Sequence, residues 1–137
     1  MDEVKSVNGG ITVEENSIIQ DDLESVNGGI SCDEGVRVHG EINSVNGIID
    51  ISKTVVDRDI TTVNGDIHMN NESVVKGNIR VEAKGISSDS RKVEIHLRGN
   101  SMVEGDIVGD EDVIVEVYLE KGSEIRGEIV NAELVEE

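Results

Sequence analysis

Carboxylate side chains recur at regular intervals along the chain and are the first candidates for binding chemistry. Each precedes the last aliphatic residue of a short motif of the form V-x-G-x-I, as in "VHGEI" and "VEGDI". They are Asp22, Glu41, Asp59, Asp106 and Glu128, with Asn78 at the equivalent place between them. Oxygen ligands of this kind suit Ca²⁺, so stacked motifs would form a ladder that binds divalent cations weakly. The alternative, which we favour, is a solvated acidic face.

The three histidines and the single cysteine are the other residues that could ligate a metal or act in catalysis. The intervals between His39, His68 and His96 match neither one nor two periods of the repeat described below. They are therefore expected to occupy outward positions in different columns, which argues against a three-histidine metal site. Cys32 falls at an inward position, as a small buried hydrophobe would. No phosphate-binding glycine loop, Ser-His-Asp pattern or calcium-binding nonapeptide occurs, so we predict no catalytic residue, no cofactor and no further metal site.

The charge of the chain restricts its partners. Its 137 residues include 30 acidic and 12 basic side chains, for a formal net charge of −18. Such a field repels phosphate backbones and anionic lipids, so we expect no nucleic-acid partner. No apolar run approaches the roughly 20 residues that span a bilayer, and no signal-peptide pattern is expected at the start. The sequence therefore predicts no direct membrane insertion.

An internal repeat indicates the elements that position these residues. "SVNGGI" at 6–11 and 25–30 returns as "SVNGII" at 44–49 and "TVNGDI" at 62–67, and every later copy follows at a nearly constant interval. The repeat aligns aliphatic residues into columns that are expected to face inward: Val7–Val26–Val45–Val63, Ile11–Ile30–Ile49–Ile67, Val13–Cys32–Ile51–Met69, Ile19–Val38–Val56–Val75 and Leu23–Ile42–Ile60–Ile79.

The C-terminal part continues the pattern with a longer period. The segment "VEIHLRGNSMVEGDIV" at 93–108 matches "VEVYLEKGSEIRGEIV" at 115–130, so that Val93 aligns with Val115. Before it, "GISSDSR" at 85–91 interrupts the repeat and is predicted to bulge out as a loop.

Copies that repeat in the same order and direction stack as parallel rungs about 4.8 Å apart, whereas hairpins would reverse alternate copies. We predict an all-β fold, a single-stranded parallel β-solenoid (right-handed β-helix) of about six coils of 18–22 residues. It forms one domain over 1–137. Regular coils of the shorter period occupy 1–84, a loop insertion follows at 85–92, and longer C-terminal coils with a cap occupy 93–137.

The Asn-Gly pairs are interpreted as corners of this solenoid. The glycines would supply a positive φ, and the asparagine amides would bond from rung to rung. The asparagines concerned are Asn8, Asn27, Asn46 and Asn64.

Two other functions of β-solenoids fit the sequence poorly. A polysaccharide lyase or hydrolase would need aromatic platforms for sugar rings, and the chain has one tyrosine and no Trp or Phe. An ice-binding face would need a regular outward column of threonines, which the four threonines do not form. We therefore predict that the protein is not an enzyme.

Two family resemblances rest on the quoted motifs. The half-repeats "VHGEI", "VEGDI" and "IRGEI" resemble the bactofilins, polymer-forming cytoskeletal proteins of bacteria, over most of the chain. The run from "SVNGGI" to "TVNGDI", roughly residues 4–81, is similar to adhesin-type β-helix repeat proteins of the bacterial envelope. These resemblances imply a bacterial β-helix without a catalytic motif, and the second implies a location in the cell envelope or periplasm.

We expect a non-enzymatic structural or scaffolding solenoid that associates with itself. The alternative is a recognition module that binds a glycan or protein along one face. The first coil is expected to present an uncovered apolar end, and the acidic "NAELVEE" at 131–137 to act as a repulsive cap. The sequence thus predicts an end-to-end homodimer through the N-terminal coil. The apolar residues expected at that end are Val7, Ile11, Val13, Ile19 and Leu23.

Overall fold

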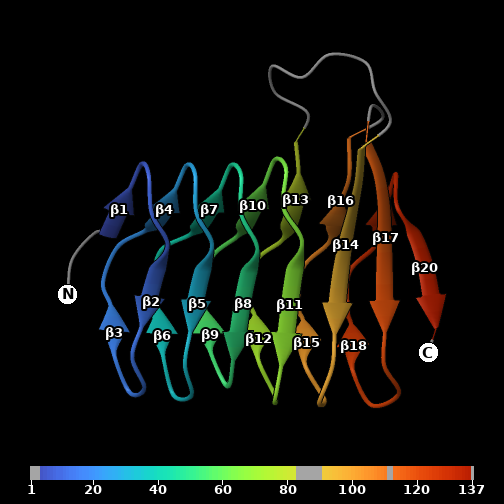
Figure 1. The fold of residues 1–137 in the computed structure, drawn as a ribbon. Coiled ribbons are helices and arrows are strands. Elements are labelled where there is room, and N and C mark those ends of the chain that lie inside the picture. The colour runs from blue at the N-terminus through green and yellow to red at the C-terminus, as the bar shows by residue number, and fades with distance from the viewer. Residues whose placement is uncertain (1–3, 83–90, 111–112, 137) are drawn as a thin grey trace.

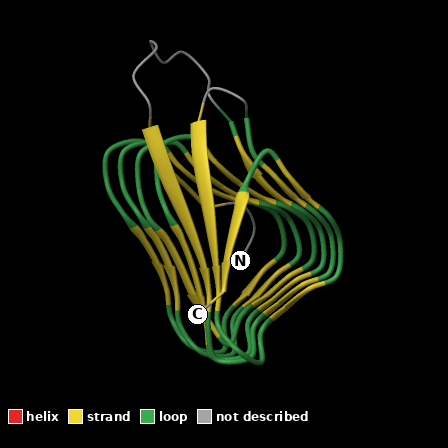
Figure 2. Cartoon of the chain, turned by 90° about the vertical axis from the view of Figure 1, so that its right-hand side faces the viewer, coloured by secondary structure: helices red, strands yellow, loops and turns green. Residues whose placement is uncertain are grey.

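The chain forms a parallel β-solenoid in a computed structural model that describes residues 4–82, 91–110 and 113–136. Three strands make each turn, and six complete turns are followed by a two-strand seventh (Figure 1). From the N-terminus on the left to the C-terminus on the right, the front strands run down and the rear strands run up, so the coil is right-handed (Figure 1). Viewed along the axis, the described chain is a single layer around a three-sided core (Figure 2). The predicted fold is confirmed.

Equivalent strands of successive turns form three parallel sheets, here called sheets 1, 2 and 3. Sheet 1 contains β1 (Val4–Ser6), β4 (Leu23–Ser25), β7 (Ile42–Ser44), β10 (Ile60–Thr62), β13 (Ile79–Val81), β16 (Ile107–Val108) and β19 (Ile129–Val130). Sheet 2 contains β2 (Ile11–Val13), β5 (Ile30–Cys32), β8 (Ile49–Ser52), β11 (Ile67–Asn70), β14 (Arg91–Leu97), β17 (Val113–Leu119) and β20 (Glu133–Glu136). Sheet 3 contains β3 (Ile18–Ile19), β6 (Arg37–Val38), β9 (Val55–Val56), β12 (Val74–Val75), β15 (Met102–Val103) and β18 (Glu124–Ile125).

The strand register follows the sequence repeat. One column of sheet 1 runs through Val4, Leu23, Ile42, Ile60, Ile79, Ile107 and Ile129. The longest step in it, from Ile79 to Ile107, contains the predicted insertion at 85–92. Most of that insertion lies outside the described residues, but Arg91 and Lys92 already belong to β14. The loop therefore ends earlier than the sequence analysis placed it.

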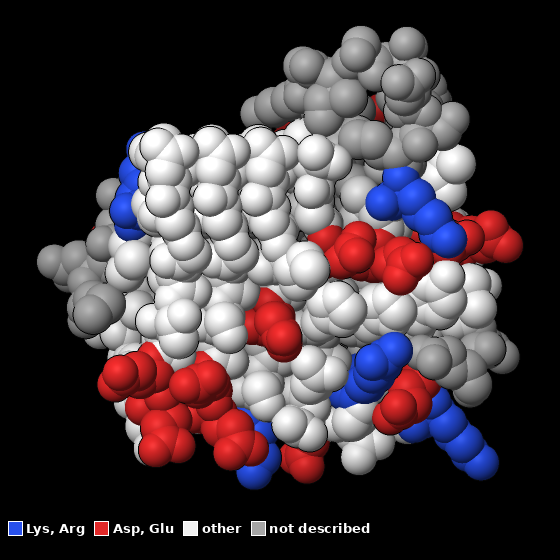
Figure 3. Space-filling model, in the orientation of Figure 1, with Lys and Arg blue, Asp and Glu red and all other residues white. Residues whose placement is uncertain are grey.

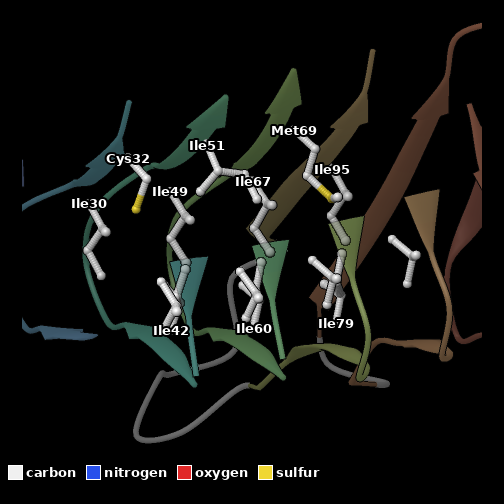
Figure 4. Packing of buried hydrophobic residues seen from close by; sticks show 14 of the residues in the cluster. Ile30, Cys32, Ile42, Ile49, Ile51, Ile60, Ile67, Met69, Ile79 and Ile95 are labelled. Atoms are coloured by element: carbon white, nitrogen blue, oxygen red, sulfur yellow. The ribbon is translucent and has the colours of Figure 1, made fainter. Parts of the chain in front are cut away.

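Aliphatic columns fill the core. The columns headed by Ile11, Val13 and Ile19 are buried through the regular turns, with Cys32 and Met69 completing the second of them. Figure 4 shows members of three inward columns stacked between the sheets: Ile30–Ile49–Ile67–Ile95, Cys32–Ile51–Met69 and Ile42–Ile60–Ile79. β-Branched residues suit this pleated surface, and a ring in one rung would leave a void in the next, which accounts for the near absence of aromatic residues.

The valines of the S-V-N-G corners do not form the continuous inward column that was predicted, although Val63 in the fourth copy is buried and Val26 is partly buried. Val7 is 54% exposed and Val45 is 37% exposed. The preceding hydroxyl residue points inward instead, because it stands two places after an inward Leu or Ile in the same strand. Ser25 and Ser44 are buried and donate hydrogen bonds of 2.7 and 3.1 Å to the carbonyl oxygens of Gly28 and Gly47. A buried hydroxyl is thereby satisfied within its own corner.

The corner glycines are needed for space, not for a positive φ as predicted. Among the described glycines only Gly35, Gly99 and Gly122 have φ in the left-handed region, and they lie in the turns between sheets 2 and 3. At the S-V-N-G corners, a Cβ on Gly47 or Gly65 would overlap the backbone carbonyl of the turn before it. Successive corners therefore approach so closely that only glycine fits.

The asparagine ladder predicted for these corners is present. The amide of each asparagine donates to the side-chain oxygen of the one before it, at 3.1, 3.0 and 3.1 Å through Asn8, Asn27, Asn46 and Asn64.

The N-terminal end is less open than predicted. Ile11, Val13 and Ile19 are at most 7% exposed. Leu23 lies in the second turn, paired with Val4 of the first. Val7 is exposed, but at a corner rather than on the end of the core.

The C-terminal end carries the open rung. Residues 133–136 form β20, which pairs in parallel with β17 instead of capping the solenoid. Leu134 continues the inward column of Val117, yet it is 42% exposed. Ile125 and Ile129 extend two other core columns and are partly exposed. The predicted exposure of the N-terminal rung is therefore wrong, and the C-terminal segment continues the coil instead of covering its end.

Candidate functional site

The acidic ladder is assembled at the corners between sheets 3 and 1, and it bonds to the backbone. Asp22 Oδ1 accepts a 2.8 Å hydrogen bond from the N–H of Glu41 in the next turn. Asp59 Oδ1 accepts likewise from Asn78, at 2.8 Å. The series continues at the same distance from Asp106 N–H to Asn78 Oδ1 and from Glu128 N–H to Asp106 Oδ1. These oxygens satisfy corner N–H groups that the sheets do not reach.

The glycine of the V-x-G-x-I motif is explained by the same contact. A Cβ on Gly77 would overlap Asp59 Oδ1, and one on Gly127 would overlap Asp106 Oδ1. Glu41 has a side chain longer by one methylene, and the turn after it carries Arg58 where the others carry glycine. The short acid or amide of one turn and the glycine of the next thus form one structural unit.

Calcium tests whether the ladder also binds cations. Among the described residues, no three His, Cys, Asp or Glu side chains are grouped to hold a metal ion. Because one oxygen of each short ladder acid already accepts a backbone N–H, we expect CaCl₂ and NaCl at matched ionic strength to raise the melting temperature equally, by screening alone. Thermal melts followed by circular dichroism measure this. A larger shift with Ca²⁺, lost in the Asp59→Asn variant, would instead support the weak calcium ladder.

A stack of three rings on the outer face of sheet 2 is the other candidate site. His68, His96 and Tyr118 come from β11, β14 and β17 and share one column. The centroids of His68 and His96 are 4.8 Å apart, and those of His96 and Tyr118 are 4.6 Å apart, with ring planes within 7°. The expectation that the histidines occupy different columns is therefore wrong for this pair, although His39 does lie elsewhere, beside sheet 3.

The register of the longest turn explains why the stack was missed. The insertion lies between His68 and His96, so their separation exceeds the period of the regular turns, and that period cannot align them. The similarity of "IHM" at 67–69 to "IHL" at 95–97 and "VYL" at 117–119 was the available signal.

Both ring nitrogens of His96 contact neighbouring side chains, one in β14 and one in the following turn. Its Nδ1 lies 3.3 Å from a guanidinium nitrogen of Arg98, and its Nε2 lies 3.0 Å from Glu94 Oε1. Arginine can only donate and a carboxylate can only accept, so the first contact suits Nδ1 as an acceptor and the second suits Nε2 as a donor. Both ring nitrogens are used within the protein, which leaves neither free to exchange a proton with a substrate.

Ion pairs border the stack. Lys92 Nζ lies 2.8 Å from Glu116 Oε1, and the Tyr118 hydroxyl donates to the same oxygen at 2.7 Å. These contacts lower the pKa of Glu116, and the hydrogen bond from His96 lowers the pKa of Glu94.

Figure 3 shows the face of the molecule with acidic side chains gathered along its lower N-terminal edge and an uncharged area above them.

Acid should weaken the stack through His68. Burial, and then the neighbouring His96, lower the pKa of His68 below 6.5. The unfolded chain therefore takes up this proton first, so stability is complete above about pH 6.5 and declines as the pH falls through that value. We expect the melting temperature to drop between pH 7.5 and 5.5 more in the native protein than in His68→Gln. The carboxylates titrate at lower pH, and parallel profiles for the two proteins would contradict this role.

Cys32 and the cluster around Asp57 complete the reactive side chains of interest. Burial, with Asp33 and Asp50 nearby, raises the pKa of the Cys32 thiol to about 12, so it is protonated and unreactive at neutral pH. Asp57 lies 2.8 Å from His39 Nδ1 and 3.2 Å from the Arg37 guanidinium. Their hydrogen bonds lower the pKa of Asp57, although its burial acts in the opposite direction.

A hollow of about 390 Å³ lies on the outer side of sheet 1, bordered by Val45, Val63, Arg80 and Glu82. The rest of its lining is polar, from Glu24, Glu41, Asn43, Ser44 and Thr61, whereas small-molecule sites are lined mainly by apolar and aromatic side chains.

Comparisons with protein families, curated proteins and solved structures found no match to this chain. The described residues include no helix of the length and apolar character needed to cross a membrane. The class of the protein is thus defined by its fold, a right-handed parallel β-solenoid.

Proposed function

We propose that this protein is a non-enzymatic scaffold that associates with itself end to end. The main observation that supports this proposal is the partly exposed C-terminal rung. There Ile125, Ile129 and Leu134 extend columns that are buried elsewhere. Apolar side chains in such a position gain by burial against another surface. The resemblance of the V-x-G-x-I half-repeats to polymer-forming bactofilins agrees with this role.

Other features favour a scaffold over an enzyme. His96 uses both ring nitrogens internally, the Cys32 thiol is protonated, and the carboxylates of Asp22 and Asp59 bond to backbone N–H groups. The side chains that could act in catalysis thus serve instead to hold successive turns together.

The contact we propose joins two C-terminal ends. The equivalent N-terminal side chains Ile11 and Ile19 are at most 7% exposed, so that end offers less apolar surface, although Val4 is partly exposed beside a shallow hollow. A two-fold axis would pair Leu134 and its neighbours with the same residues of a second copy and would close the contact. This moves the contact from the N-terminal coil expected from the sequence to the opposite end.

Light scattering coupled to size exclusion tests the proposal. We expect a dimer at micromolar concentration in 0.3 M NaCl, which screens the acidic groups of both ends, and a monomer for Leu134→Lys. Ile48→Lys is the matched control, because Ile48 is similarly exposed but lies at a corner far from this end. A native monomer at high micromolar concentration, or a dimer that Leu134→Lys leaves intact, would overturn it. Retention of a glycan or another protein by the monomer would favour the recognition module.

A further inference from the structure

The outer face of sheet 3 is balanced in charge, although the chain as a whole is strongly acidic. Two outward columns run along it, on either side of the buried column of Ile19. Column X is Ile18, Arg37, Val55, Val74, Met102 and Glu124. Column Y, two residues further on in each turn, is Gln20, His39, Asp57, Lys76, Glu104 and Arg126.

Column X places an apolar strip on this face. Ile18 is 49% exposed, and Val55, Val74 and Met102 are partly exposed. No other described element lies over the outer face of sheet 3 (Figure 2). Burying these side chains against a partner would be favourable.

When column Y is placed against a reversed copy of itself, no charged residue lies opposite one of the same sign. If a second copy lies antiparallel, with a two-fold axis between the third and fourth turns, Asp57 faces Lys76 of that copy. On the same axis His39, cationic when protonated, faces Glu104, and the uncharged Gln20 faces Arg126. In column X the same operation places Val55 against Val74.

We infer that the outer face of sheet 3 pairs with the same face of a second copy in antiparallel orientation. Like charges would meet at none of the six rungs of column Y. Opposite charges would meet at the two central rungs, and at the next two when His39 is protonated. Charge order of this kind selects the partner and its register. The contact is separate from the end contact proposed above and does not depend on it.

The other two faces show less of this complementarity. On the same axis, between the third and fourth turns, the outward column of sheet 1 places one carboxylate opposite an arginine, Glu24 against Arg80. That of sheet 2 places Asp50 against His68 and contains no lysine or arginine. The outward column of sheet 1 is Lys5, Glu24, Asn43, Thr61, Arg80, Val108 and Val130, and that of sheet 2 is Thr12, Ser31, Asp50, His68, His96, Tyr118 and Val135.

The paired face is narrow, so a single contact is weak. Six rungs span only about 24 Å along the axis, and the strands of sheet 3 have two residues each. A stable interface normally buries about 800 Å² on each partner. The experiment should therefore trap the contact with a covalent bond and show whether the two copies lie antiparallel.

Cysteine cross-linking between two differently labelled variants meets both needs. In the antiparallel pair Arg37 faces Met102 of the other copy, whereas two Met102 residues, or two Arg37 residues, lie three turns apart, about 14 Å. We expect mild oxidation of a mixture of Arg37→Cys and Met102→Cys to give mainly the mixed disulfide dimer, with little from either variant alone. Both variants carry Leu134→Lys, which removes the proposed end contact. The cross-link therefore reports on sheet 3 alone, whether or not the end contact exists in the native protein. Lys5→Cys, on sheet 1, replaces Arg37→Cys as the control and should not cross-link.

A charge reversal supplies the second measurement. Adding Lys76→Glu to both cysteine variants should strongly reduce the mixed product, because it faces Asp57 of the other copy with a like charge. Within one chain Lys76 Nζ lies 4.0 Å from Asp57, which keeps its shorter contact with His39, so the solenoid itself should stay folded. Adding Lys5→Glu, which changes the net charge equally, should leave the mixed product unchanged. Absence of the mixed dimer, equal yields from single variants, or insensitivity to Lys76→Glu would each overturn the inference.

Discussion

Ile49→Asp should unfold the protein, whereas Val45→Asp, at the corner just before it, should change its stability little. Ile49 is completely buried in the core column of sheet 2. An unpaired carboxylate there has no polar partner, and the lost packing alone costs about 2–5 kcal/mol. Together these losses match the total stability of an ordinary domain, about 5–15 kcal/mol. Val45 points outward at a corner and is 37% exposed, so its replacement should stay within about 1 kcal/mol.

Circular dichroism melts of the two variants separate these outcomes directly. The native protein and Val45→Asp should show similar midpoints, and Ile49→Asp should lack a cooperative transition. The comparison also decides which residue of the S-V-N-G corner faces the core. Equal destabilisation by both substitutions would mean that the valine, not the preceding serine, points inward.

Gly65→Ala should be strongly destabilising, whereas Gly9→Ala in the first copy of the same motif should be tolerated. A Cβ on Gly65 would overlap the carbonyl oxygen of Gly47, and backbone cannot move aside as a flexible side chain can. Overpacking of this kind costs about 1–3 kcal/mol, sometimes more. At Gly9, in the first turn, the nearest atom is Ser6 Oγ at 3.5 Å, an ordinary contact.

Chemical denaturation of both glycine variants at constant pH provides the measurement. The midpoint should fall clearly for Gly65→Ala and remain near the native value for Gly9→Ala. Because φ is not positive at either glycine, backbone strain does not enter the comparison. A similar loss in both variants would indicate that the corner conformation, rather than the close approach of turns, requires glycine.

The consequence for function is that most of the repeated residues maintain the stacking of turns. The Asn8–Asn64 ladder, the inward Ser25 and Ser44 hydroxyls and the Asp59–Gly77 contact each satisfy or accommodate backbone at a corner. The two association surfaces that we propose lie outside these ladders, at the C-terminal rung and on sheet 3. The proposed scaffold function therefore depends on the apolar and charged side chains that remain exposed at these two surfaces.

The repeat pattern was enough to predict the solenoid and most of its core. Columns such as Ile11–Ile30–Ile49–Ile67 recur at nearly constant spacing, and stacked parallel turns are the arrangement in which every copy buries the same side chains. The rung-to-rung amides of Asn8 and its equivalents were predictable for the same reason, since identical turns place identical side chains one rung apart.

The corners, the ring stack and the ends depend on contacts between turns and could not be predicted in this way. At a corner the chain leaves the strand after Ser25, so the alternation of inward and outward residues stops, and the hydrophobicity of Val26 no longer reports its direction. The insertion before β14 makes the separation of His68 and His96 in the sequence longer than the regular period, so the repeat does not reveal that their rings stack. The role of Asp59 depends on a backbone N–H in the next turn, and the exposure of Leu134 depends on β20 pairing with β17. A repeat pattern records residue types along the chain without recording which backbone groups the contacts between turns must satisfy.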